Sequence, residues 1–92
     1  MKPVRWSSDK NLSLKAERGV SFEEVLACIA QGGLIKVMGH PNSAKYGHQK
    51  LLVVRIRDYA YLVPFVETED EIFLKSIIPS RKATRDFLPE GT

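Results

Sequence analysis

The period of the hydrophobic pattern changes at Gly32-Gly33, and this change limits the possible folds more than any other property of the sequence. Before these glycines, apolar residues recur at helical spacing over 21–31, directly after the capping box Ser21-Phe22-Glu23-Glu24. After them, apolar and polar residues alternate as they do in strands, most clearly over 50–57. A chain that changes once from helical to strand periodicity indicates an α+β domain, with helices packed on one face of a sheet.

Local signals predict the position of each element. We expect helices over 7–18 and 21–31, strands over 34–38, 50–57, 60–66 and 71–78, and a short helix over 81–88. Asp58-Tyr59 is a plausible tight connection between two of the strands, and Pro64, which cannot donate to a ladder, predicts an edge or a bulge. The expected fold is therefore α+β, with two N-terminal helices packed on a four-stranded, mainly antiparallel sheet and a short C-terminal helix.

The strand predicted over 50–57 has two different faces. One is fully apolar and holds Leu52, Val54 and Ile56. The other begins with Leu51 and Val53 and ends with Arg55 and Arg57, which lie two residues apart and so are expected to point the same way. The second apolar face needs a cover, and the C-terminal helix, another subunit or a partner chain would each provide one.

Length and composition bound the possible classes of protein. The 92 residues predict one domain, 1–92, with 43% hydrophobic and 27% charged residues, as in ordinary globular proteins. A single cysteine, Cys28, excludes an intrachain disulfide, and there is no Cys/His quartet for zinc. We expect no metal, no cofactor, no signal peptide and no membrane span, and thus a cytoplasmic domain.

Charge is unevenly distributed along the chain. Residues 1–57 hold ten Lys/Arg and four Asp/Glu, a net charge of +6, whereas 58–92 hold four and seven, a net charge of −3. A basic surface suits an anionic partner such as nucleic acid, although an ordinary solvated surface accounts for the same numbers.

Two segments of the chain resemble a known family. Trp6, Asp9-Lys10-Asn11 and the run 18–24, together with the late stretch 77–84, resemble BrnT-type toxins of bacterial type II toxin–antitoxin systems. The resemblance implies a small RelE-like fold and a ribonuclease that works without a metal ion to arrest growth. It also implies a cognate antitoxin protein, encoded by the neighbouring gene, that silences the toxin in a complex; a homo-oligomer is also open.

Metal-free RNA cleavage needs a base, an acid and positive charge at the transition state. We expect Arg81 to contact the scissile phosphate, because it follows a helix-capping serine and lies near a helix N-terminus. Lys50, at the start of a strand, is the second predicted phosphate contact, and His40 or His48 is predicted to transfer protons. An ordinary surface role is the alternative for each of the four.

Four further residues are predicted RNA contacts: Lys10, Tyr46, Arg55 and Arg57. Tyr46 offers a ring for a base to stack on, and the paired arginines suit a phosphate backbone. Loop packing or surface charge explains the same residues. A non-catalytic RNA- or partner-binding protein of the same fold, a decayed toxin, therefore stays open beside the ribonuclease.

Overall fold

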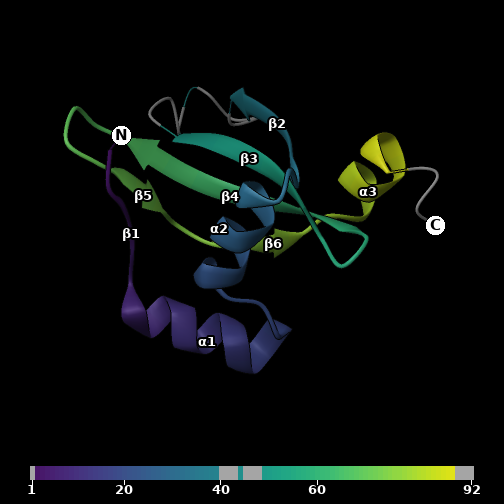
Figure 1. Ribbon diagram of the computed structural model, residues 1–92, viewed down its shortest axis with the longest axis horizontal. Coiled ribbons are helices and arrows are strands. Elements are labelled where there is room, and N and C mark those ends of the chain that lie inside the picture. Colours follow the sequence, from purple (N-terminus) through teal and green to yellow (C-terminus); the bar gives the residue numbers. More distant parts are fainter. Residues whose placement is uncertain (1, 40–43, 45–48, 89–92) are drawn as a thin grey trace.

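Figure 1 shows the computed structural model of the protein, which describes residues 2–39, 44 and 49–88. The elements follow in the order β1 (Val4–Trp6), α1 (Ser8–Arg18), α2 (Phe22–Ala30), β2 (Leu34–Gly39), β3 (Gln49–Ile56), β4 (Tyr59–Glu67), β5 (Ile72–Leu74), β6 (Ile78–Pro79) and α3 (Arg81–Phe87). The α+β class and the three predicted helices are thus confirmed.

The sheet has six strands and is mixed, whereas the sequence predicted four strands. Its order is β1-β5-β4-β3-β2, and β6 also pairs with β4. All pairs are antiparallel except β1 with β5, which is parallel. The strand β1 was not predicted, because three residues are too few to show an alternating pattern.

The strand predicted over 71–78 is divided into β5 and β6, and both parts pair with β4. Pro64 lies opposite this interruption, on β4, and its carbonyl accepts a hydrogen bond from Lys75 N at 2.7 Å. The carbonyl and the amide nitrogen of one residue point to the same side of a strand, so the missing N–H of Pro64 faces the break. The prediction of an edge or a bulge was therefore wrong: β4 is a central strand, and the proline is tolerated because its neighbour is interrupted.

The β3–β4 connection is a two-residue turn at Arg57 and Asp58, one residue earlier than predicted. Ile56 pairs with Tyr59, and the two turn residues have φ of 51° and 66°. Positive φ at both central positions matches the right-handed twist of the flanking strands, which makes this the favoured turn for a tight hairpin.

A serine caps the N-terminus of each of the three helices. The hydroxyls of Ser7, Ser21 and Ser80 accept hydrogen bonds from the backbone N–H groups three residues later. Gly19 ends α1 in the left-handed conformation with φ of 69° and donates its N–H to Lys15 O. These local interactions fix where α1 ends and α2 begins.

The main core lies between the sheet and the pair α1 and α2 (Figure 1). Its largest fully buried side chains come from the two helices and from strand residues that point to the same face of the sheet. They include Leu14, Phe22, Val54, Ile56 and Leu74. The ring of Trp6 stacks on Phe22 with centroids 5.5 Å apart, so Trp6 belongs to this core. The apolar face predicted for the strand around Val54 is thus confirmed.

The second face of the sheet is covered in part by α3. A small core of Val53, Ala60 and Ala83 forms there, with half-buried neighbours that include Leu62 and Leu88. Of the three covers that the sequence left possible for this face, the C-terminal helix therefore provides one. No helix in the described part of the chain is long and apolar enough to cross a membrane.

Candidate nucleic-acid interface

The α3 face of the sheet carries the candidate site, and Ala60 fixes its geometry. Ala60 O accepts from Ser80 N at 3.0 Å, and Ala60 N donates to Thr84 Oγ1 at 2.9 Å. The Thr84 hydroxyl in turn donates to Ser80 O at 2.8 Å. One residue of β4 therefore holds the first turn of α3, which begins at Arg81.

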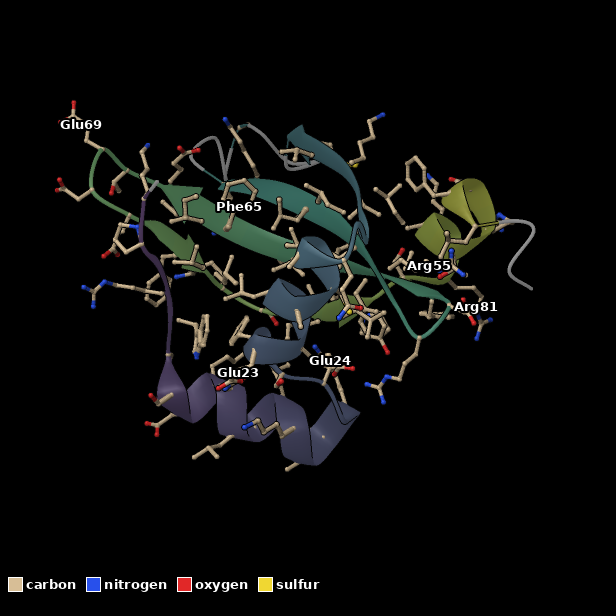
Figure 2. The ribbon with its side chains drawn as sticks, in the orientation of Figure 1. Glu23, Glu24, Arg55, Phe65, Glu69 and Arg81 are labelled. Carbon is tan, nitrogen blue, oxygen red and sulfur yellow. The ribbon has the colours of Figure 1, made fainter. Side chains whose placement is uncertain are left out.

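Arg55 lies beside this anchor. It pairs with Ala60 across β3 and β4, and both polar groups of Ala60 are directed toward α3. Such a pair has no hydrogen bonds of its own, and its Cα atoms lie about 4.5 Å apart. Arg55 and Arg81 therefore flank the same residue of β4, and Figure 2 shows both at the end of the sheet where α3 lies.

Other cations join these two arginines on the α3 face. The cluster, here called the α3 cationic cluster, consists of Lys36, Arg55, Arg81, Lys82 and Arg85, all exposed. Two acidic residues reduce its charge: Asp58 pairs with Arg55, and Asp86 pairs with Arg85 at 3.6 Å. Within the described residues, Arg81 and Lys82 form no ion pair, so their charges are available to an anionic ligand.

Lys50 lies elsewhere. It pairs with Phe65 near the far end of β4, five residues from Ala60, or about 17 Å along the strand. Phe65 belongs to the core under α1 and α2, so Lys50 shares that face rather than the α3 face. Together with Lys2 and Glu67 it lines a hollow of about 480 Å³. The expectation that Arg81 and Lys50 hold one phosphate is therefore corrected, because they lie on opposite faces and at opposite ends of β4.

Arg57 also lies outside the candidate site. The sequence predicted that it would share a face with Arg55, but the positive φ values of the turn end the alternation. Its guanidinium donates to Gly19 O at 2.8 Å and to Glu24 Oε1 at 3.2 Å, on the α2 side of the sheet. Arg57 therefore ties the hairpin to the helices, and only Arg55 of the predicted pair lies on the α3 face.

The remaining predicted residues do not meet this cluster in the described structure. Lys10 is exposed on α1, on the other side of the sheet. His40, Tyr46 and His48 lie outside the described residues. No group of three or more His, Cys, Asp or Glu in the described part is placed to hold a metal ion.

Two buried polar residues were missed by sequence reasoning. Asn11 accepts from Phe22 N at 2.8 Å and donates to Glu23 Oε1 at 2.7 Å, so it joins α1 to α2. This hydrogen bond to Asn11 lowers the pKa of Glu23 below its usual 4.5, with Lys15 adding a smaller effect. Thr84, the anchor of α3, is the second. Polar residues are common on helices, so neither Asn11 nor Thr84 stands out in the sequence. Only their hydrogen bonds to buried backbone N–H groups show that they are structural.

Cys28 is half-buried on α2 and lines a hollow of about 340 Å³ at the edge of the sheet, together with Gly33 and both arginines of the predicted pair, Arg55 and Arg57. Burial raises the pKa of its thiol above the usual 9.0, and the charge of Glu24 raises it further. The thiol therefore stays protonated at neutral pH, which argues against a nucleophilic role.

Comparisons of the chain with protein-family models, with curated proteins and with solved structures find no match.

Proposed function

We propose that this protein is a metal-independent ribonuclease toxin of a type II toxin–antitoxin system, which binds RNA through its α3 face. The observation that carries the proposal is the α3 cationic cluster, in which Arg81 and Lys82 have no ion-pair partner among the described residues. The segments that resemble BrnT-type toxins supply the ribonuclease reading, and the α+β fold with two N-terminal helices is compatible with it.

In the proposed reaction, the guanidinium of Arg81 binds the scissile phosphate and stabilises the negative charge that builds up at the transition state. Arg55 lies on the other side of Ala60 and contributes a second, partly neutralised charge. The proton transfers remain assigned to His40 or His48. Lys50 is no longer assigned to this phosphate, and we assign it an RNA contact at the opposite end of β4.

A non-catalytic RNA- or partner-binding protein is the second candidate. It is favoured by the separation of Lys50 from Arg81, because Arg81 then lacks the second predicted phosphate contact, and both proton transfers depend on groups outside the described residues. Both candidates share an anionic ligand on the α3 face, and both fit a cytoplasmic protein that forms a complex with an antitoxin from the neighbouring gene.

Inducible expression in a bacterial host, with and without the neighbouring gene, tests the proposal. We expect growth arrest and cleaved RNA with the wild-type chain, and rescue by the antitoxin. Arg81→Ala should lower the cleavage rate by about 10²–10³, as the loss of one transition-state charge contact does. Arg5→Ala is the matched control, because Arg5 is an exposed arginine on β1, far from α3, where it pairs with Glu71.

The histidines are tested by the double change His40→Ala, His48→Ala, which should lower cleavage by about 10²–10⁴. RNA binding without cleavage by the wild-type chain would favour the second candidate. Full toxicity of Arg81→Ala, with circular dichroism showing a folded protein, would remove the proposed site.

A further inference from the structure

An apolar groove lies within the proposed RNA face, between the sheet and α3. Its floor is formed by Met38, Leu51, Leu62, Ala83 and Phe87, and its volume is about 270 Å³. Phe87 is 36% exposed although it is a large aromatic residue. Ala60 and Ala83 have small side chains that let α3 pack close to the sheet, and the groove runs along α3 from its capping residue Ser80 to Phe87.

Charged and polar groups surround the apolar floor. Lys36 Nζ lies 5.8 Å from the centroid of the Phe87 ring, and Lys82 lines the groove itself. Ser80 and Asp86 also line it. The Ser80 oxygens already accept hydrogen bonds within α3, whereas the Asp86 carboxylate, which pairs with Arg85 at 3.6 Å, has lone pairs left to accept from a ligand. A flat ring with N–H groups at its edge and an attached anion matches this combination of apolar floor, acceptors and cationic rim.

We propose that the groove binds one unstacked base of a single-stranded RNA against Phe87, with Lys36 and Lys82 at the adjoining phosphates. The proposal rests on the proposed function and names its substrate class. Bases in a duplex are paired and stacked and do not enter such a groove, whereas single strands present bases to aromatic side chains.

The size of the groove favours a base over a segment of a partner protein. Its volume is below the usual range for small-molecule pockets, about 300–1,000 Å³, and suits a single ring. An amphipathic helix instead docks through anchors spread over two turns and needs a longer apolar trough. The cationic rim further favours an anionic ligand.

The same sheet offers a matched control at its other end. Lys75 Nζ lies 5.4 Å from the ring centroid of Phe73 on β5, which resembles the pair of Lys36 and Phe87. Phe73 pairs with Val66 near the end of β4 and does not line the groove. Changes at the two pairs remove the same chemical groups, but only one pair belongs to the proposed base site.

The test measures fluorescence anisotropy with a short labelled RNA of mixed sequence, 2′-O-methylated so that it resists cleavage, as a single strand and as a duplex. We expect the wild-type chain to prefer the single strand. Phe87→Leu should weaken single-strand binding by about 5- to 150-fold, as loss of base stacking does, and leave duplex binding unchanged. Phe73→Leu should leave both unchanged, and Lys36→Ala should weaken binding more than Lys75→Ala.

Equal binding of both probes, or equal losses for Phe87→Leu and Phe73→Leu in folded proteins, would overturn the base site while leaving the proposed function intact. Loss of antitoxin co-purification by Phe87→Leu, with unchanged RNA binding, would assign the groove to a protein partner and also overturn it. A wild-type chain that binds neither probe at low salt would instead remove the proposed function. Cleavage assays with Arg81→Ala are independent of these outcomes.

Discussion

The two faces of the sheet are stabilised to very different degrees. Under α1 and α2 lie large side chains that are almost fully buried, such as Phe22, Leu14 and Ile56. Under α3 the core cluster is smaller and consists of Val53, Ala60 and Ala83, with Leu51 buried beside it and a groove and several cations around it. The first face supplies most of the apolar burial, which leaves the second free to carry exposed charge and an open aromatic ring.

On each face of the sheet, one buried polar side chain forms hydrogen bonds that join a helix to its neighbouring element. Asn11 and Thr84 are the two buried polar residues in the described part of the chain. Asn11 links α1 to α2, and Thr84 links α3 to β4. Because α3 has only seven residues and a small core, we expect it to open more easily than the helices on the other face.

The largest expected effect tests the difference between the two faces directly. Phe22→Ala removes a fully buried ring that stacks on Trp6, and should lower the free energy of unfolding by about 3–5 kcal/mol. Phe87→Ala on the α3 face should cost far less, since that ring is partly exposed. Urea denaturation measures both, and similar losses for the two variants would contradict the comparison.

Asn11→Ala should have the next largest effect. It leaves Phe22 N–H buried without a partner and removes a hydrogen bond to the Glu23 carboxylate, at a cost of about 1.5–3 kcal/mol. Ser13→Ala, at an exposed position of the same helix, controls for the change to alanine. A denaturation midpoint equal to that of the control would show that Asn11 does not join the helices.

Thr84→Val should weaken the α3 face alone. The valine keeps the shape of threonine but leaves Ala60 N–H without a hydrogen-bond partner, which should lower the stability of the α3 face by about 1–3 kcal/mol. The loss cannot exceed the free energy of opening α3, because water then reaches the N–H group. Hydrogen exchange should accelerate at Ala60 and in α3, with α1 and α2 unchanged. Thr84→Ser keeps the hydroxyl and should exchange like the wild type, and uniform acceleration across both faces would argue against separate opening.

The smallest expected effect is a pH dependence on the α1 and α2 face. The pKa of Glu23 is lowered in the folded protein, first by its hydrogen bond to Asn11. Its contribution to stability is therefore present above the unfolded pKa near 4.5 and is lost as the pH falls through the lower folded value. Glu23→Gln should flatten the stability profile below pH 4.5, whereas Glu17→Gln, a control for charge, should retain its slope.

The helix ends and the alternation of the central strands follow from local patterns of residues. Ser7, Ser21 and Ser80 cap amides only three residues away, and Gly19 ends α1 through its own backbone conformation. Such interactions lie within one helical turn, so they can be read from neighbouring residues. The alternation at Leu52, Val54 and Ile56 likewise follows from strand geometry alone.

Which distant residues come into contact depends on the packing of the whole fold. The parallel pairing of β1 with β5 joins segments nearly seventy residues apart, with Val4 opposite Ile72. Arg81 comes to lie beside Arg55 rather than Lys50, because Ser80 and Thr84 bind Ala60 while Lys50 pairs with Phe65. These neighbours depend on strand register and on the face to which α3 returns. Both are set by the burial of side chains distant in sequence, which no local pattern contains.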